Sequence, residues 1–278
     1  MIDNAPVINI NNSNNDVAVL KSKKLFVLDM DGTFYLGDRL FEGSLDFIEK
    51  LKSAGKEFLF FTNNASKSPE FYMDKLARMG CPIERSNIAT SGDVAVRYLT
   101  ANHPEKKVFL VGTKLLEDSF KNAGVRLAEP MEDDPDIVAV SYDTTLTYEK
   151  VSRACRFIRG GAAFIATHMD LNCPTEEGFI PDCGSICAMI TASTGVKHRY
   201  FGKPFGETLE MIEDMTGCRK EDMAIVGDRL YTDIAMGYKN GVASILVLSG
   251  ETKIADLANS EIKPDFVFNS IADIADII

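Results

Sequence analysis

The chain is built from short apolar runs that alternate with segments of helical periodicity. Two clear runs, "LFVL" from Leu25 and "MAIV" from Met223, contain no alternating polar residues. Such runs are typical of parallel strands that are covered on both faces. Strands that alternate with helices along a chain form doubly wound sheets, so we expect an α/β fold with a Rossmann-like parallel sheet. Strands are expected at 24–29, 56–64, 107–112, 136–142, 163–167, 222–228 and 243–249.

Helix boundaries are marked by capping residues. A helix is expected over 42–55, where Gly55 ends it, and another over 68–80. The second has Ser68 at the N-cap and Pro69 at the first helical position, where both residue types are favoured.

The composition excludes several classes of protein. Apolar residues make up 45% of the chain and charged residues 26%, as in globular proteins with a sizeable core. The net charge of −11 disfavours binding to nucleic acids or anionic membranes. No apolar run approaches the ~20 residues of a membrane span. Because the chain starts with an Asn-rich segment and no signal pattern, we expect a flexible tail over 1–20 and a cytoplasmic protein.

The six cysteines are expected to be reduced thiols, because a large chain without a signal pattern has no need of a disulfide framework. A zinc site is the alternative, since His168, Cys173, Cys183 and Cys187 fall within twenty residues. Their spacing matches no standard zinc knuckle, which favours the thiols.

Two pairs of acids stand at the ends of expected strands. Asp29 and Asp31 follow the first apolar run, and Asp228 follows "MAIV", with Asp233 five residues later. Residues i and i+2 of an extended chain point to the same side, so the first two carboxylates can face one small volume. Carboxylates that close repel each other unless a cation neutralises them, and Mg²⁺ prefers oxygen ligands. Taken alone, either pair could equally be turn or helix-capping acids.

Three further polar residues occupy the same kind of position. Thr62 and Asn63 end the run "KEFLFF", and Lys203 stands between Gly202 and Pro204. A hydroxyl, an amide and a compact cation can hold phosphate oxygens, and ligands of open α/β sheets bind at the carboxyl ends of the strands. Taken singly, the first two are as typical of a turn, and the lysine of a solvated surface.

Along the chain these residues follow the order acid-acid, Thr, Lys, acid-acid. This order resembles the motifs of the haloacid dehalogenase-like (HAD) hydrolases, read here as "DMDGT" from Asp29, Thr62, Lys203 and "GDRLYTD" from Gly227. The stretches "FTNNASKSP", "PDCGSI" and "GKP" look like the NagD-like branch, class IIA, which carries an inserted α/β cap. The resemblance covers the chain from about residue 23 onward. At Asp182-Cys183 the chain departs from the Pro-Gly pattern common in this branch, which bears on the shape of the substrate pocket.

The resemblance implies a phosphatase that depends on Mg²⁺. Asp29 would attack phosphorus to form an aspartyl-phosphate, and Asp31 would protonate the leaving alcohol and then activate water. Mg²⁺ would be held by the Asp29 carboxylate, the Asp31 backbone carbonyl and Asp228, with Asp233 in support. The transferring phosphoryl oxygens would be held by Thr62, Asn63 and Lys203.

The spacing of these residues predicts an inserted domain. About 140 residues lie between Thr62 and Lys203, and no compact loop is that long. We expect a catalytic core formed by 21–86 and 187–278, and a smaller α/β cap over 87–186.

Cap residues are expected to contact the leaving group and determine substrate specificity. The candidates are acids and one histidine in the segments "SYDTT" and "THMDLNCPTEEGFIPDCGS". Their negative charge disfavours leaving groups that carry extra charge, and so favours sugar, polyol, nucleoside or pyridoxal phosphates. The family's cap also suggests a homodimer. The candidate specificity residues are Asp143, His168, Asp170 and Asp182.

Three other functions compete with this interpretation. A receiver module also carries an aspartyl-phosphate, but it is about half as long and has adjacent acids. A phosphotransferase or mutase of the same superfamily would share Asp29 and Asp31 and differ in the acceptor. A catalytically silent scaffold is disfavoured because every reactive position is intact.

Overall fold

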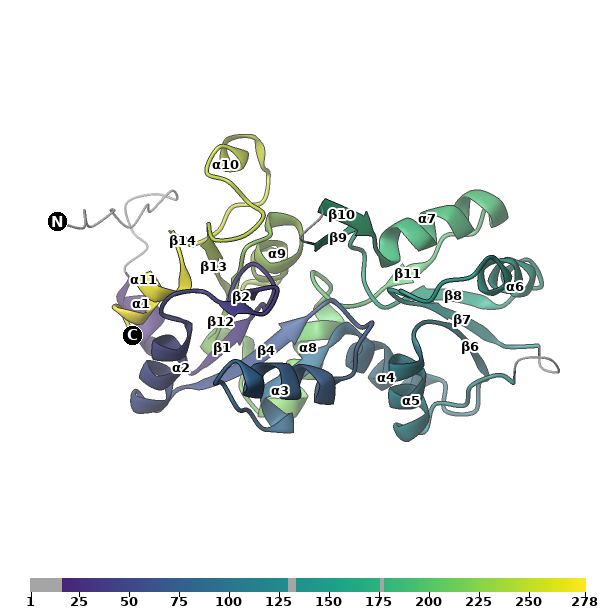
Figure 1. Ribbon diagram of the computed structural model, residues 1–278, viewed down its shortest axis with the longest axis horizontal. Helices are drawn as coiled ribbons and strands as arrows, with labels where there is room; N and C mark the ends of the chain where they lie inside the picture. The colour runs from purple at the N-terminus through teal and green to yellow at the C-terminus, as the bar shows by residue number, and fades with distance from the viewer. Residues whose placement is uncertain (1–16, 130–133, 176–177) are drawn as a thin grey trace. The chain divides into compact units, whose positions relative to one another are not determined.

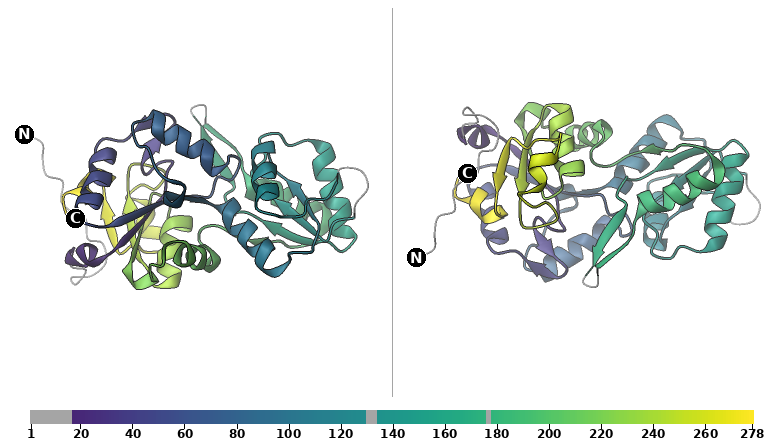
Figure 2. Two further views of the ribbon diagram at one scale, coloured as in Figure 1. Left: turned by 90° about the horizontal axis from the view of Figure 1, so that it is seen from below. Right: turned by 90° about the horizontal axis from the view of Figure 1, so that it is seen from above.

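The computed structural model describes residues 17–129, 134–175 and 178–278. The chain divides into two compact units, and Figures 1 and 2 show its ribbon from three directions. The first unit consists of the chain up to Phe61, Met73–Ala89 and Ile212–Ile278, and the second of Thr62–Tyr72 and Thr90–Met211.

A six-stranded sheet lies at the centre of the first unit. Across the sheet the order is β14 (Phe266–Phe268), β13 (Ala243–Val247), β12 (Met223–Gly227), β1 (Leu25–Leu28), β4 (Glu57–Thr62) and β5 (Ile88–Thr90). The pairings described from β14 to β4 are all parallel. Every residue of β1 and β12 is buried, which explains the uninterrupted apolar runs that predicted these strands. The doubly wound α/β class is confirmed.

Helices and one hairpin connect these strands. The hairpin of β2 (Tyr35–Leu36) and β3 (Arg39–Leu40) follows β1. Helix α2 (Ser44–Ser53) packs against α11 (Ile271–Ala275), and α9 (Ala235–Asn240) packs against β12 and β13. The other elements are α1 (Ala18–Ser22), α3 (Pro69–Arg78), α8 (Gly206–Thr216), α10 (Asp256–Asn259) and two 3₁₀ turns, Arg85–Asn87 and Lys220–Asp222.

The expected flexible tail covers residues 1–20. Residues 1–16 lie outside the described residues. Residues 18–20 belong to α1, which buries Leu20 completely, so an apolar contact orders this part of the chain.

The second unit has its own parallel sheet of four strands, as a cap of the NagD type requires. Their order is β11 (Arg199–Tyr200), β8 (Ala163–Ala166), β7 (Ile137–Val140) and β6 (Val108–Val111). Two strands, β9 (Asn172–Thr175) and β10 (Gly178–Pro181), form a separate antiparallel hairpin. The helices are α4 (Ser91–Asn102), α5 (Lys114–Asn122), α6 (Tyr148–Arg159) and α7 (Cys183–Thr194).

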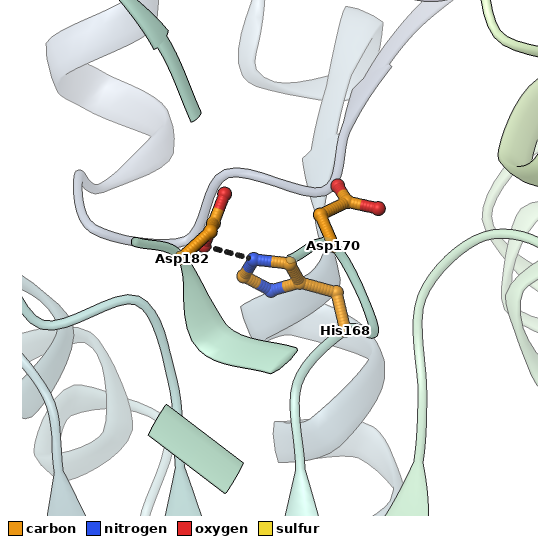
Figure 3. Close-up of side chains that lie close together, drawn as sticks. All are labelled: His168, Asp170 and Asp182. Carbon is orange, nitrogen blue, oxygen red and sulfur yellow. Dashed lines mark hydrogen bonds and ion pairs between the residues drawn. The ribbon is translucent and has the colours of Figure 1, made fainter. Parts of the chain in front are cut away.

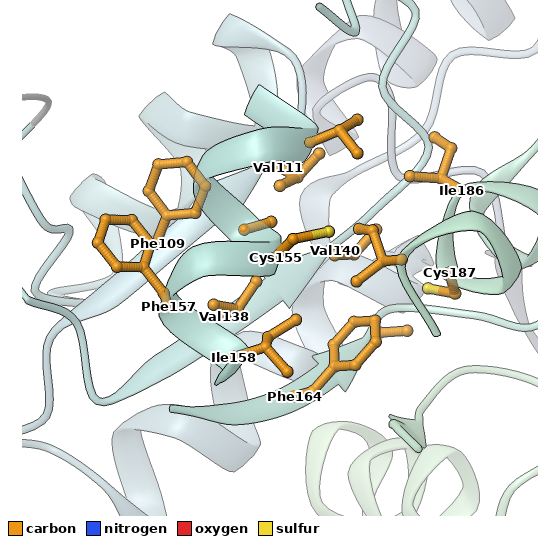
Figure 4. Packing of buried hydrophobic residues seen from close by; sticks show 14 of the residues in the cluster. Phe109, Val111, Val138, Val140, Cys155, Phe157, Ile158, Phe164, Ile186 and Cys187 are labelled. Atoms are coloured by element: carbon orange, nitrogen blue, oxygen red, sulfur yellow. The ribbon is translucent and has the colours of Figure 1, made fainter. Parts of the chain in front are cut away.

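Helices α6 and α7 cover one face of the four-stranded sheet, and α4 and α5 lie on the other side (Figure 1). Figure 4 shows the core under α6 and α7, where Phe157 packs edge-on against Phe109 and Cys187 faces the strands. The expected cap boundary at residue 186 falls within α7. Ile190 lies in the same core and β11 pairs with β8, so the four-stranded unit continues past that residue.

The helices α4, α5, α6 and α7 each begin at a capping side chain. Thr90, Thr113 and Thr147 accept hydrogen bonds from backbone N–H groups of the first turns of α4, α5 and α6. Asp182 accepts from the N–H of Cys183 at the start of α7. These caps satisfy backbone donors that have no partner within the helix, and they fix where the chain leaves each strand.

Within the described part of the chain, no helix is both long and apolar enough to cross a membrane. All six cysteines are free thiols.

Candidate active site

The first group of site residues lies at the carboxyl edge of the six-stranded sheet. Strands β1 and β12 are parallel neighbours with Leu28 opposite Val226. Asp29 and Asp228 therefore leave the sheet at the same edge, and the Asp29 N–H donates to the Val226 carbonyl at 2.9 Å. The register of two buried strands thus brings together acids that are about 200 residues apart in the sequence.

A third acid completes this group. Ligand oxygens of Asp29, Asp228 and Asp233 all lie within 4.8 Å of one another. Asp233 sits in a π-helical turn, Leu230–Ile234, and accepts from the N–H of Arg229 at 3.2 Å. Such turns are rare and occur frequently at functional sites, where they redirect a side chain.

Hydrogen bonds fix the Asp228 carboxylate. It accepts from the Glu251 N–H at 2.7 Å and from the Thr33 hydroxyl at 3.3 Å. These bonds come from two loops, one after β1 and one after β13, so the loops at this edge of the sheet share one acceptor.

Glycines make room for these acids. A Cβ atom at Gly227 would lie 2.2 Å from the Asp233 side chain, and one at Gly250 would lie 2.0 Å from Asp228 Oδ2. At Gly32, which has a φ of +90°, it would lie 2.6 Å from the same oxygen. No side chain fits at these positions, which indicates that backbone and carboxylates must approach closely here.

The acid group fits a divalent cation. Asp228 and Asp233 are buried, at 2% and 1% exposure, and burial makes the repulsion between carboxylates costly unless a cation offsets it. All the donor atoms are oxygens, the ligand type of Mg²⁺ and Ca²⁺ and not of softer metals. The residues present can therefore hold such an ion.

Asp31, the expected proton carrier, lies next to this group in the chain. Its carboxylate accepts from the hydroxyl of buried Tyr35 at 3.4 Å. The Gly32 N–H donates to the Tyr35 carbonyl at 2.8 Å, so the β2–β3 hairpin folds back on the Asp31 segment.

The second group of site residues lies in the second unit and centres on Asn63. The Asn63 Oδ1 atom accepts from the Lys203 N–H at 2.8 Å, and Nδ2 donates to the Lys203 carbonyl at 3.1 Å. Nδ2 also lies 3.3 Å from Asp170 Oδ2. The neighbouring Thr62 hydroxyl accepts from the Asn64 N–H at 3.1 Å. Asn63 therefore holds the backbone on both sides of Lys203.

Gly202 permits this contact. Its φ is +71°, and a Cβ atom there would lie 2.6 Å from Asn63 Oδ1 and 2.9 Å from the Ser91 side chain. Only glycine combines that backbone conformation with the space available.

Figure 3 shows three more expected residues, His168, Asp170 and Asp182, in the same unit. His168 is fully buried, and its Nε2 lies 2.8 Å from Asp182 Oδ1. Burial by itself lowers the pKa of His168, but the neighbouring Cys183 sulfur and the Asp182 and Asp170 carboxylates outweigh it and raise the pKa to about 9. His168 is therefore a cation at neutral pH.

Asp143, the fourth expected specificity residue, forms hydrogen bonds and an ion pair with residues that follow it closely in the chain. It pairs with the Lys150 ammonium at 2.6 Å and accepts from the N–H and hydroxyl of Thr145. These bonds give the buried carboxylate a structural part in the loop that leads into α6.

The structure thus brings the expected residues together in two groups. The first unit contains Asp29, Asp31, Asp228 and Asp233, and the second contains Thr62, Asn63, Lys203, His168, Asp170 and Asp182. One residue of the second group, Ser91, was not expected. The Ser91 hydroxyl donates to the Asn63 carbonyl at 2.6 Å. The only signal for Ser91 in the sequence is its place after the capping residue Thr90, and that signal is not specific.

Known proteins match this chain in sequence over most of its length. A family model described as haloacid dehalogenase-like hydrolase matches residues 26–126, and a second, HAD-hydrolase-like model matches residues 200–274. An acid sugar phosphatase of Staphylococcus epidermidis is 32% identical over 91% of this chain and 96% of its own.

Two solved structures extend the comparison. The 4-nitrophenylphosphatase of Thermotoga maritima has a TM-score of 0.88 and 45% identity, covering 93% of this chain and 98% of its own. A glycerol phosphate phosphatase of Mycobacterium tuberculosis, solved in complex with calcium, has a TM-score of 0.85 and 28% identity, covering 92% and 76%. Together with the acid group at the edge of the core sheet, these similarities show that the chain belongs to the haloacid dehalogenase-like hydrolases, in the branch of NagD and the p-nitrophenylphosphatases.

Proposed function

We propose that this phosphatase hydrolyses small phosphate monoesters through a phosphorylated Asp29. The observation that carries the proposal is the convergence of Asp29, Asp228 and Asp233 within 4.8 Å at the carboxyl edge of the core sheet. Asp29 is less buried than the other two acids, which suits a carboxylate that must meet a substrate. The names of the relatives support the reaction class, since they include phosphatases of sugar and glycerol phosphates.

Asp29 and Asp31 divide the chemistry between them. An Asp29 oxygen attacks phosphorus as the bond to the leaving alcohol breaks, and Asp31 delivers a proton to that alcohol. Asp31 then takes a proton from the water that releases phosphate from Asp29. The Tyr35 hydroxyl, 3.4 Å from Asp31 Oδ2, orients the carboxyl group for both steps. A positioned acid–base residue contributes about 10²–10⁴-fold.

We propose Mg²⁺ as the cation of the acid group. The Asp29 and Asp228 carboxylates and the Asp31 backbone carbonyl would hold it, and Asp233 would support Asp228. When bound, Mg²⁺ neutralises the charge that develops on the phosphoryl oxygens. The buried, all-oxygen donor set supports a hard cation.

Thr62, Asn63 and Lys203 are proposed to hold the transferring phosphoryl group. Phosphoryl transfer is accelerated mainly by positioning and by charge stabilisation. Lys203 supplies a positive charge on a backbone that Asn63 holds from both sides. This fixed backbone supports the assignment, because a residue whose main chain is held in place needs less reorganisation in the transition state.

The substrates we propose are sugar, polyol, nucleoside or pyridoxal phosphates, with leaving groups that carry no further negative charge. The acidic cap residue Asp170 supports this preference. Two further proposals accompany it, a homodimer in solution and a location in the cytoplasm.

A panel of phosphate monoesters with Mg²⁺, scored by released inorganic phosphate, tests the proposal. We expect release from several neutral leaving groups and weaker release from diphosphates. A phosphotransferase or mutase would transfer the group to an added alcohol and release little phosphate, which would contradict hydrolysis. No turnover of any ester in the panel would contradict the proposed function.

A further inference from the structure

We propose that His168 and Asp182 form a buried imidazolium–carboxylate pair that positions Lys203 through Ser91 and Asn63. The inference rests on the proposed function of Lys203 as a phosphate-binding residue. It assigns His168 and Asp182 to positioning, whereas the sequence had suggested that they contact the substrate. Every residue in the argument belongs to the second unit.

The first step is the contact between His168 and Asp182. Nε2 lies 2.8 Å from Asp182 Oδ1, and the two side chains are 0% and 5% exposed. Asp182 also caps α7 by accepting from the Cys183 N–H. The N-terminus of a helix favours a negative charge, and Asp182 accepts a hydrogen bond from Nε2–H.

The second step is the other ring nitrogen. His168 Nδ1 lies 3.3 Å from Ser91 Oγ and 2.9 Å from Thr167 Oγ1. The Ser91 hydroxyl already donates to the Asn63 carbonyl at 2.6 Å. The Thr167 hydroxyl donates to Ser141 Oγ at 3.0 Å. A hydroxyl has one proton to donate, so Ser91 and Thr167 both accept from His168, which assigns a hydrogen to Nδ1.

Both ring nitrogens are therefore donors, which defines an imidazolium. The Cys183 sulfur and the carboxylates of Asp182 and Asp170 lie next to the ring, and together they raise the pKa of His168 to about 9 despite its burial. The hydrogen-bond pattern and the raised pKa thus agree on the same protonation state.

The last step leads to Lys203. Ser91 fixes the backbone of Asn63, whose side chain binds the N–H and the carbonyl of Lys203. Gly202 lies close to the same residues, since a Cβ atom there would lie 2.6 Å from Asn63 Oδ1 and 2.9 Å from the Ser91 side chain. The path from His168 to Lys203 thus runs through Ser91 and Asn63, which makes His168 a positioning residue.

Imidazole nitrogen NMR on the full-length protein tests the protonation state without any activity measurement. The chain has three histidines, so His168→Gln assigns the signal. We expect both nitrogens of His168 to be protonated at neutral pH, and one of them to lose its proton in Asp182→Asn. A singly protonated His168 in the wild type overturns the pair, as does a stoichiometric zinc ion bound through Nε2.

Binding of inorganic phosphate in the presence of Mg²⁺ tests the link to Lys203. We expect His168→Gln and Asp182→Asn, once shown to be folded, to weaken phosphate binding about tenfold and to raise KM more than they lower kcat. His198→Gln is the matched control. His198 is a half-buried histidine of the same unit whose ring meets Thr191 at 3.2 Å, outside the network.

Unchanged phosphate affinity in a folded Asp182→Asn variant would overturn the positioning role. If the wild type releases phosphate from no ester, the proposed function fails, while the imidazole spectra still decide whether the ion pair exists. The two proposals can therefore fail separately.

Discussion

Asn63 binds both backbone groups of Lys203, 140 positions further along the chain, at 2.8 and 3.1 Å. Lys203 belongs to no strand, and the Asn63 side chain satisfies the backbone N–H and C=O groups that a neighbouring strand would otherwise bind. Because both partners are buried, loss of either bond would leave a polar group without solvent or partner. This contact is the structural basis of the proposed phosphate-binding residues.

The first prediction concerns the glycine beside this contact. Gly202→Ala should lower the melting temperature and the activity, because the new methyl group meets Asn63 Oδ1 at 2.6 Å and the backbone φ of +71° disfavours alanine. Gly195→Ala is the control, since Gly195 has a φ of +75° and nothing lies within 4 Å of the position that its new methyl group would take. Both variants should carry the ~1–2 kcal/mol of backbone strain, and only Gly202→Ala should carry the clash. Equal losses of melting temperature would contradict this.

The second prediction concerns the pH dependence of stability. The pKa of His168 is raised from 6.5 to about 9 in the folded protein. The stability that this group contributes is fully present below pH 6.5 and is lost as the pH rises through about 9. Melting temperatures of the wild type and of His168→Gln, measured across this range, should therefore converge at the alkaline end. A difference that stays constant with pH would show that His168 is not charged in the folded state.

The fold could be predicted where the chain buries long apolar runs. Strands β1, β12 and β13 lie within their expected ranges, because a strand that is covered on both faces needs four or five consecutive apolar residues. Strands β5 and β14 were not predicted. Each has three residues, too few to show a periodicity. The pairing of β9 with β10 was not predicted either. All residues of β10 are exposed, so the strand has no buried face that would leave an apolar pattern in the sequence.

The acid group could be predicted because its members belong to compact motifs at strand ends. The network around His168 could not, because it joins residues from separate elements that share no local pattern. Ser91 and His168 are 77 positions apart, and the segment of α4 that contains Ser91 has no unusual composition. Only the folded chain shows that the Ser91 hydroxyl donates to Asn63 and the Thr167 hydroxyl to Ser141. Both hydroxyls are therefore acceptors for His168.

The third prediction concerns the metal. A chelator should abolish turnover, and Mg²⁺ should restore it, since the oxygen ligands of Asp29 and Asp228 suit a small hard cation. Ca²⁺ should bind and fail to restore turnover, because it takes more ligands at longer distances. Asp228→Ala should lose the response to Mg²⁺. Full activity in the presence of chelator would contradict a metal role for Asp228.

The fourth prediction separates the role of Asp31 from that of Asp29. Asp31→Asn should lower kcat by about 10²–10⁴-fold for alkyl phosphates, whose leaving alcohols need a proton. The loss should be smaller for 4-nitrophenyl phosphate, because nitrophenolate leaves readily without one. Tyr35→Phe, which removes the hydroxyl 3.4 Å from the Asp31 carboxylate, should give the same pattern with smaller losses. Equal losses for both classes of substrate would argue against proton transfer by Asp31.

The most direct test of the account is the turnover of 4-nitrophenyl phosphate by Asp29→Asn with saturating Mg²⁺. Asparagine keeps the shape of the side chain and removes the nucleophilic oxygen, so circular dichroism should be unchanged. The account predicts a loss of kcat on the order of 10³-fold or more, for aryl and alkyl esters alike. Turnover at the wild-type rate by the folded variant would contradict the assignment of Asp29 as the residue that receives the phosphoryl group.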